Sequence, residues 1–399
     1  MKSVAEAQRY FLDVAAKATE TEQISITDAL GRICASDVVS NLDIPPQDNS
    51  AMDGIAIACS ERREFGLSQR IPAGAAPNPL QADTAARIFT GGVIPEGADT
   101  VVIQENCTFS DDGKLVTVHS TPKHGDNIRP RGQDIRQGAT VVSRGKQLSS
   151  VDLSLLSSVG QAKVEVFRKL KIYIFSTGDE LVEPGDALQP GQIYNSNRIL
   201  LKSLCVQAGC ELIDGGLVED TLEATKYALE MASREADLII SSGGVSVGEE
   251  DHVKPAVEAL GELNFWKVQM KPGKPVAFGN INESKFMGLP GNPVSAFVVF
   301  QLLAMPLIKA LQGASVELPK PFKVSAAFNK PELQREEYLR VKLEYSTDGS
   351  PQANLFPNLS SGVMSSIGWA DGLVRQMPNH EICAGDLVDF FPLHSGSLW

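Results

Sequence analysis

The spacing of apolar residues changes along the chain. Near the N-terminus they recur with helical spacing, at Val4, Ala7, Phe11, Val14 and Ala18. This spacing predicts an amphipathic helix. From about residue 40 to 168, glycine and proline are frequent, apolar runs are short and no long helical period appears. We therefore expect an irregular β-rich region there.

Strand and helix patterns alternate between residues 170 and 313. Buried strands are predicted at 170–175, 238–240, 276–278 and 286–289. The helices between them begin at capping residues: Asn195 or Ser196, then Asp220 with Glu223 as a capping box, then Asn292 with Pro293. This alternation predicts an α/β sandwich with a largely parallel sheet.

The last quarter of the chain has a β pattern again. Leu339, Val341, Leu343 and Tyr345 alternate with polar residues, which predicts a half-buried strand. Pro319-x-Pro321 marks a boundary before it, and Asp348-Gly349 suggests a turn. We expect a small β-barrel or sandwich over residues 316–399.

Length and charge limit the classes of function. A chain of 399 residues is too long for one core, so two to four domains are expected. The net charge of −13, with no basic tail, argues against nucleic acid and against docking on an anionic membrane. The six cysteines are scattered without a CxxC pair, which disfavours a zinc cage.

Neither the N-terminus nor the longest apolar run indicates a membrane protein. The N-terminal segment carries charges throughout its apolar stretch, unlike a signal peptide. The run 297–308 is judged too short to span a bilayer. We expect a soluble, cytoplasmic protein with no membrane partner.

Two glycine- or serine-rich loops follow predicted strands, at 176–180 and 241–248. Ligands bind at such strand ends in α/β sheets, and consecutive N–H groups can form an anion nest. The carboxylates beside them, among them Asp179, Glu180 and Asp251, would repel a phosphate unless Mg²⁺ lay between. The alternative for each loop is a tight turn with capping acids.

Four further segments carry residues suited to anion binding. Residues 45–54 are polar and lead directly into an apolar strand, and 127–134 place two arginines near an aspartate. Residues 271–275 place two lysines around a Pro-Gly turn, and 289–293 open a helix. Solvated turns or a surface hairpin are the alternatives for the first three, and the helix start alone accounts for the fourth.

Seven segments together resemble one family. They are PPQDNSAMDGIAI, RIFTGGVIPEGADTVVIQE, NIRPRGQDI, FSTGDEL, SSGGVSVGEEDH, MKPGKPVAFG and GLPGNPVSA. In this order they resemble the molybdopterin molybdenumtransferases of the bacterial MoeA type, related to the E domain of gephyrin. The α/β region alone is shared with the adenylyltransferase that acts one step earlier, so the flanking segments decide between the two. The chain departs from the family at Ile55, where Tyr is frequent, and resembles it only loosely over 358–373.

The resemblance implies a multidomain α/β plus β protein. Residues 1–40 with 136–169 would form a discontinuous helical and linker domain, and 41–135 an elongated β-rich domain. Residues 170–315 would form the α/β molybdopterin-binding domain, and 316–399 the C-terminal β-barrel. It also implies an elongated homodimer, with each active site in a cleft lined by both subunits, and contact with the upstream adenylyltransferase.

The activity implied is insertion of molybdate into adenylylated molybdopterin, with Mg²⁺ as cofactor and release of AMP. The implied catalytic residues are Asp53, Thr90, Asp134, Asp179 and Glu180. The implied substrate-binding residues are Arg129, Arg131, Ser242, Gly243, Gly244, Lys267, Lys271, Lys274, Ser295, Arg340 and Ser361. Asp220 and Asp251 would bind the metal, while Lys271, Lys274 and Ser295 would hold molybdate.

Three other functions stay open at this point. They are the upstream adenylyltransferase, a gephyrin-like scaffold without catalysis, and a pterin carrier. Molybdate-dependent release of AMP would separate the transferase from all three.

Overall fold

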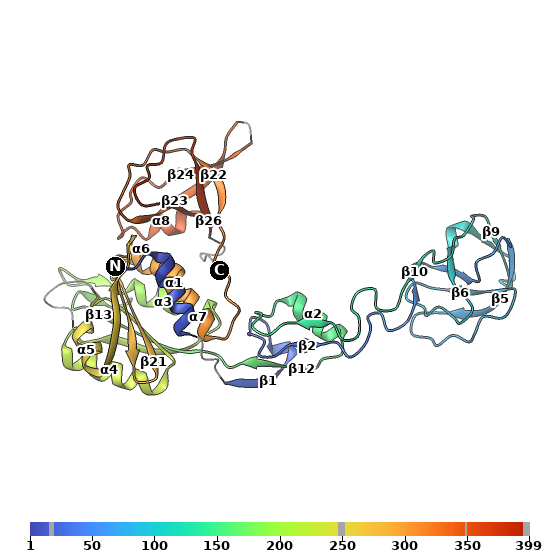
Figure 1. The fold of residues 1–399 in the computed structure, drawn as a ribbon, viewed down its shortest axis with the longest axis horizontal. Coiled ribbons are helices and arrows are strands. Elements are labelled where there is room, and N and C mark those ends of the chain that lie inside the picture. The colour runs from blue at the N-terminus through green and yellow to red at the C-terminus, as the bar shows by residue number, and fades with distance from the viewer. Residues whose placement is uncertain (16–19, 246–251, 348, 394–399) are drawn as a thin grey trace.

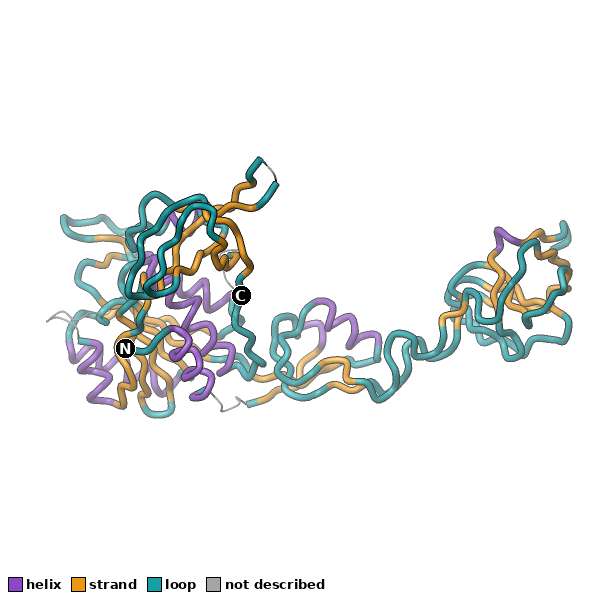
Figure 2. The backbone as a smooth tube through the Cα atoms, turned by 45° about the horizontal axis from the view of Figure 1, so that its top comes forward, coloured by secondary structure: helices purple, strands orange, loops and turns teal. Residues whose placement is uncertain are grey.

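The computed structural model describes residues 1–15, 20–245, 252–347 and 349–393. Figures 1 and 2 show an elongated molecule. An α/β body, built from the strands and helices of residues 171–311, lies at one end with a β-barrel beside it. A slender neck leads from the body to a distal β lobe at the other end.

The body is built on a six-stranded sheet with the order β16-β13-β17-β21-β20-β18. Its strands are β13 (Lys171–Thr177), β16 (Glu211–Val218), β17 (Leu238–Ser242), β18 (Gly261–Lys267), β20 (Pro275–Ile281) and β21 (Ser284–Leu289). β16, β13, β17 and β21 are parallel, whereas β20 and β18 are antiparallel to their neighbours. The largely parallel sheet is confirmed. β14 (Leu181–Val182) and β15 (Ile193–Tyr194) form a separate small pair.

Helices α3 (Ser196–Gln207), α4 (Leu222–Glu235) and α5 (Val253–Leu260) also belong to the body. Asn195 caps α3 by accepting a hydrogen bond from the backbone of Arg198, as expected. The capping box expected at Asp220 is wrong, because Thr221 caps α4 and accepts from the Ala224 N–H at 3.2 Å. Thr221 is the residue with extended backbone angles, so the carboxylate of Asp220 is not used as a cap.

A long apolar helix runs through the core of the body. α6 (Pro293–Val299), a π-helical turn (Phe300–Ala304) and α7 (Met305–Leu311) follow without a break. These 19 residues are long and apolar enough to cross a membrane, but 94% of the apolar window is buried inside the protein. The helix is thus longer than the run 297–308 and long enough to span a bilayer, contrary to expectation, but its burial identifies it as a core helix. It packs against α1 (Val4–Val14), the amphipathic helix expected from the sequence.

The neck and the distal lobe form the β-rich region. The neck contains β1 (Thr21–Ser25), β2 (Val38–Val39), β11 (Thr140–Val142), α2 (Ser150–Ser158) and β12 (Lys163–Phe167). The lobe is a six-stranded sheet of β4 (Gly54–Ile57), β5 (Glu64–Ile71), β6 (Thr84–Ile88), β7 (Thr100–Ile103), β8 (Cys107–Phe109) and β9 (Leu115–Val118). β3 (Asn49–Ser50) pairs with β10 (Ile128–Arg129) where the lobe joins the neck. Helix α2 was not anticipated, since nine residues behind a Ser149–Asp152 capping box are too short to show a helical period.

The C-terminal region is a closed barrel, so the expectation of a β-barrel is confirmed and the alternative of a sandwich is not. Its strands are β22 (Phe322–Ala326), β23 (Glu336–Tyr345), β24 (Pro351–Leu355), β25 (Gly372–Gln376) and β26 (Leu387–Pro392), with α8 (Ser365–Trp369) between β24 and β25. The barrel closes because β23 pairs with both β24 and β25. β19 (Met270–Lys271) of the body adds to β23.

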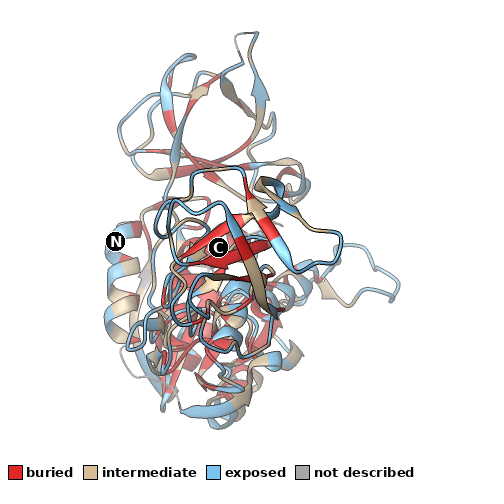
Figure 3. Ribbon diagram, turned by 90° about the vertical axis from the view of Figure 1, so that its right-hand side faces the viewer, coloured by how far each residue is buried: buried red, intermediate tan, exposed pale blue. Residues whose placement is uncertain are grey.

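Strand β23 is not half-buried as expected. Leu339 and Val341 lie in the barrel core, but Tyr338 and Arg340 on the other face are also buried, with Tyr338 packed into the core of the body. Tyr345, expected inside, is 77% exposed. The alternation failed because the body covers the outer face of this strand. Figure 3 shows how buried residues follow the strands while exposed ones lie on loops and outer helix faces.

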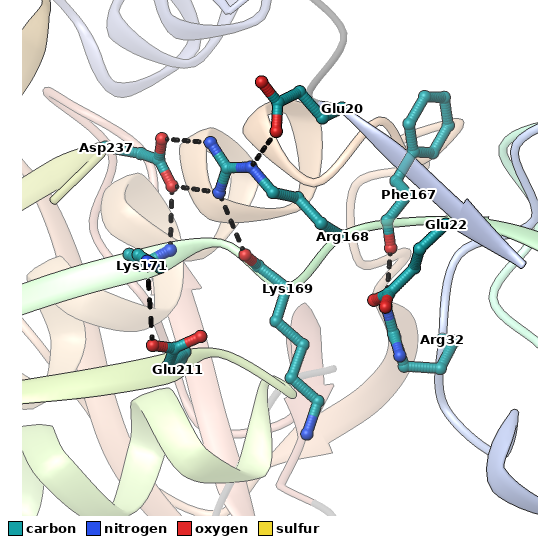
Figure 4. Close-up of polar contacts among 9 residues, drawn as sticks. All are labelled: Glu20, Glu22, Arg32, Phe167, Arg168, Lys169, Lys171, Glu211 and Asp237. Atoms are coloured by element: carbon teal, nitrogen blue, oxygen red, sulfur yellow. Dashed lines mark hydrogen bonds and ion pairs between the residues drawn. The ribbon is translucent and has the colours of Figure 1, made fainter. Parts of the chain in front are cut away.

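A charged cluster joins the neck to the body (Figure 4). The guanidinium of Arg168 donates two hydrogen bonds to the carboxylate of Asp237, at 2.7 and 2.8 Å. Asp237 also accepts from the Lys171 N–H at 2.8 Å. Burial pushes the pKa of Asp237 upward, but the hydrogen bonds from Arg168 and Lys171 outweigh it and hold the pKa below its ordinary value. The pair therefore ties the start of β17 to the end of β12.

Asp237→Asn is expected to lower the free energy of unfolding by about 2 kcal/mol at neutral pH, because a neutral amide cannot replace this charge-assisted pair. The pKa is lower in the folded protein than in the unfolded chain. The stabilisation is therefore complete above the ordinary value of 3.8 and is lost as the pH falls through the folded-state pKa. Urea unfolding should show the deficit at pH 7 and a smaller one near pH 3. Glu211→Gln, which breaks a long ion pair with Lys171, is the control and should change little.

Candidate active site

A pocket of about 710 Å³ opens at the carboxyl ends of β13 and β17. Its lining includes Thr177, Gly178, Glu180, Asn197, Asp220, Ser242, Gly243, Gly244, Gly291 and Gly362. Both loops selected from the sequence thus meet at one pocket. Parallel strands bring their ends to the same edge of a sheet, which explains the meeting.

The wall formed by Gly243 and Gly244 has no room for side chains. Both residues have positive φ, +94° and +63°. A Cβ on Gly243 would lie 2.5 Å from the carbonyl oxygen of Thr177. A ligand can therefore approach the backbone closely here, as a phosphate requires. Residues 246–251 lie outside the described part of the chain, and with them the predicted metal ligand Asp251.

An amide that sequence reasoning missed organises the floor of the pocket. Asn197 is buried, and its Nδ2 donates to Ser242 Oγ at 3.0 Å and to the Gly291 carbonyl at 2.7 Å. These bonds tie α3 to the end of β17 and to the loop that opens α6. Its Oδ1 is buried without a hydrogen-bond partner among the described residues. The available signal was a second polar residue in the first turn of a helix, two positions after the cap Asn195.

Two carboxylates, Asp220 and Glu180, line the pocket, whereas Asp179 is exposed and is not part of the lining. Asp220 Oδ1 accepts a hydrogen bond from Thr177 Oγ1 at 2.7 Å. Among the described residues no group of three or more His, Cys, Asp or Glu could hold a metal. Mg²⁺ needs only one or two carboxylates when substrate phosphate oxygens complete its shell. Asp220 and Glu180 are thus oxygen ligands of the kind that Mg²⁺ takes beside a phosphorylated ligand.

Five other predicted residues lie on the distal lobe or where it joins the neck. Asp53 Oδ1 accepts from the Thr90 N–H and from Thr90 Oγ1, both at 2.8 Å, and these bonds hold the pKa of Asp53 below its usual value. Arg131 forms an ion pair with Asp43 at 2.6 Å, while Arg129 and Asp134 are exposed.

In Figures 1 and 2 the distal lobe and the body lie at opposite ends of the molecule. Within one chain the predicted site residues therefore form two groups, one at the pocket of the body and one on or beside the distal lobe.

The two lysines of the loop 271–275 have different surroundings. Lys271 forms an ion pair with Glu337 of the barrel at 3.0 Å, whereas Lys274 is exposed. Of the two lysines around the Pro-Gly turn, Lys271 is therefore partly neutralised by a carboxylate of the barrel. Lys267 is partly exposed at the end of β18, and Ser295 is buried in the first turn of α6. Among the residues described, neither Lys267 nor Lys274 forms an ion pair within 4.0 Å.

Arg340 contributes to the pocket indirectly, because it hydrogen-bonds to a loop that forms part of the pocket wall. Its side chain is buried and donates to Ser366 Oγ at 3.1 Å and to the carbonyls of Asn358 and Ser360 at 3.3 Å. Burial lowers the pKa of this guanidinium. The loop continues to Ser361, whose carbonyl accepts from the N–H of Val294 at 3.0 Å, and to Gly362 in the pocket wall. Arg340 thus positions this wall.

Family models match almost the whole chain. The MoeA N-terminal region (domain I and II) matches residues 2–160, a probable molybdopterin-binding domain matches 173–310, and the MoeA C-terminal region (domain IV) matches 323–393. A molybdopterin molybdenumtransferase from Haemophilus influenzae is 45% identical over 316 residues, which cover 78% of each chain. The chain belongs to the MoeA family.

Other MoeA relatives agree with this assignment. The molybdopterin molybdenumtransferase of Nostoc is 38% identical over 307 residues, covering 74% of this chain and 70% of the relative. Two crystal structures of Pyrococcus horikoshii MoeA proteins superpose with TM-scores of 0.78 and 0.82, at 30% and 28% identity. They cover 97% and 98% of this chain and 98% and 99% of their own. Because matches flank the α/β region on both sides, the MoeA assignment does not rest on the domain shared with the adenylyltransferase.

Proposed function

We propose that this chain transfers molybdenum from molybdate to adenylylated molybdopterin and releases AMP, as the last step of molybdenum cofactor biosynthesis. The observation that carries this proposal is the glycine-walled pocket with two carboxylates at the strand ends. Its relatives are named for molybdenum transfer to molybdopterin.

The residues of the pocket suit cleavage of a pyrophosphate. This reaction needs charge neutralisation and positioning more than a strong protein nucleophile. The backbone at Gly243 and Gly244 and the hydroxyl of Ser242 would hold the phosphates. Asp220 and Glu180, with Asp251, would hold Mg²⁺, which when bound neutralises phosphate charge and polarises the phosphoryl oxygens. Lys271, Lys274 and Ser295 would hold molybdate, a tetrahedral dianion.

The site is proposed to be completed by a second copy of the chain. Asp53 and Thr90 belong to the distal lobe, and Arg129 and Asp134 lie where it joins the neck. In Figures 1 and 2 this part of the chain is far from the body that holds the pocket. In a homodimer, the distal lobe of the partner would bring these groups to the pocket. We further propose that the enzyme works in the cytoplasm, in contact with the adenylyltransferase that supplies its substrate.

The test is AMP release from adenylylated molybdopterin by the purified full-length chain with Mg²⁺. Release that saturates with molybdate is the expected result. Binding without turnover would instead indicate a carrier or a scaffold. Consumption of ATP with molybdopterin would indicate the adenylyltransferase reaction.

A further inference from the structure

A buried carboxylate lies at the seam between the barrel and the body, where β19 pairs with β23. Glu337 on β23 has a side chain that is only 1% exposed. One of its oxygens lies 3.0 Å from Lys271 Nζ, and the other lies 3.0 Å from Lys330 Nζ. Lys271 belongs to the body and pairs with Glu337 in the register of β19 and β23, whereas Lys330 belongs to the barrel. One carboxylate therefore forms ion pairs with two lysines from two parts of the chain, and Oε2, which faces Lys330, has no hydrogen-bond partner among the described residues.

The seam carries more positive than negative charge. Burying a carboxylate costs several kcal/mol unless cations and hydrogen bonds replace its water, so an ion pair between Glu337 and Lys271 is expected. Lys330 and the buried Arg340 add further positive charge, and Arg340 is close enough to interact with Glu337. The neighbouring Glu336 does not balance them, because it accepts from the Tyr338 hydroxyl and faces Arg375. Such a surplus favours a second anion.

The seam adjoins the active-site pocket. Lys271 begins the loop that reaches Pro275 in the pocket wall. Gly273 in this loop packs against α6, since an added Cβ would lie 3.6 Å from the carbonyl oxygen of Ser295. The side chain of Lys271 is 37% exposed, although its ammonium contacts Glu337. An anion that binds at this edge of the pocket would therefore contact Lys271, which already forms an ion pair with Glu337.

We propose that Glu337 competes with molybdate for Lys271, and that Lys330 weakens this competition by sharing the carboxylate. The inference rests on the proposed function, in which Lys271 binds molybdate. If the binding-competent state of Lys271 is only partly populated, the apparent affinity falls by that fraction. Glu337 and Lys330 would then be positioning residues with opposite effects on molybdate affinity.

Two substitutions test this opposition by calorimetric titration of the full-length protein with molybdate alone. Glu337→Gln removes the competing charge, so the Kd for molybdate should fall about tenfold, or about 1.4 kcal/mol. Lys330→Met leaves Glu337 to Lys271, so the Kd should rise by a similar factor. Lys323→Met is the matched control, because its lysine pairs with Asp389 elsewhere on the barrel. It should leave the Kd unchanged.

Loss of stability cannot imitate this pattern. Both Glu337→Gln and Lys330→Met should lower the Tm, because each leaves a buried charge with fewer partners. A merely structural role predicts two losses of stability with no opposite change in affinity. If Glu337→Gln does not fold, Glu337→Asp keeps the charge but shortens its reach, and should still lower the Kd.

The inference is overturned if both variants shift the Kd in the same direction, if neither shifts it, or if the wild type shows no saturable molybdate binding. These titrations involve no turnover. A wild type that binds molybdate but releases no AMP would count against the proposed function and leave the opposite Kd shifts standing.

Discussion

Asp220→Asn is expected to reduce molybdate-dependent AMP release by at least about 100-fold while the chain stays folded. Asparagine keeps an acceptor for the hydroxyl of Thr177, which now lies 2.7 Å from Asp220 Oδ1. It removes the negative charge that would hold Mg²⁺ against the substrate phosphates. The pocket should therefore keep its shape and lose its capacity to neutralise the pyrophosphate. The measurement is kcat at saturating molybdate, with thermal unfolding as the check on folding.

Thr177→Val is the matched control for this variant. It removes the same hydrogen bond and keeps the carboxylate, so it should reduce the rate by no more than about tenfold. The magnesium concentration that gives half-maximal rate should rise in Asp220→Asn more than in Thr177→Val. Near-normal AMP release by Asp220→Asn would remove this residue from the site. Equal losses in the two variants would assign Asp220 a structural role.

Much of the body could be predicted because its signals are local. The strands are short buried runs, and Asn195 and Gly209 mark the ends of α3 by capping and by a positive φ of +82°. Once the sheet is parallel, its strand-end loops must lie together, which is why the pocket was foreseen. The shift of the cap from Asp220 to Thr221 shows the limit of this reasoning. Both residue types cap helices well, and only the backbone angles decide between them.

The seam between barrel and body could not be predicted from local pattern. Glu337 and Arg340 look like residues of a solvated strand in the sequence, yet both are 1% exposed. Their burial depends on a contact between segments some 70 residues apart, Met270–Lys271 and Glu336–Tyr345. Asn197 was missed for a similar reason, because its partners Ser242 and Gly291 come from distant loops. The boundaries assigned to the four regions and the homodimer stay predictions.

The separation of the site residues has a consequence that can be measured with two inactive variants. Asp53→Ala removes a residue of the distal lobe, and Asp220→Asn removes one of the pocket. Each homodimer should have less than about 1% of the wild-type rate. The two chains are then co-expressed with different tags, and the heterodimer is isolated by sequential affinity purification. Light scattering should show a dimer, and a monomer at micromolar concentration would contradict the shared site.

The heterodimer should recover about half of the wild-type rate per dimer. If each site combines the pocket of one chain with the distal lobe of the other, one site carries both substitutions and the other carries none. If each site is instead built within one chain, both sites carry one substitution and no activity returns. The first outcome is the expected one, because Asp53 directly precedes β4 of the distal lobe and Asp220 lies between β16 and α4 of the body. The neck keeps the lobe and the body at opposite ends of the same molecule. A heterodimer of Asp220→Asn with Glu180→Gln provides the control, since both substitutions lie in the pocket. It should stay inactive in either arrangement, so recovery confined to the first pair would locate Asp53 across the dimer interface.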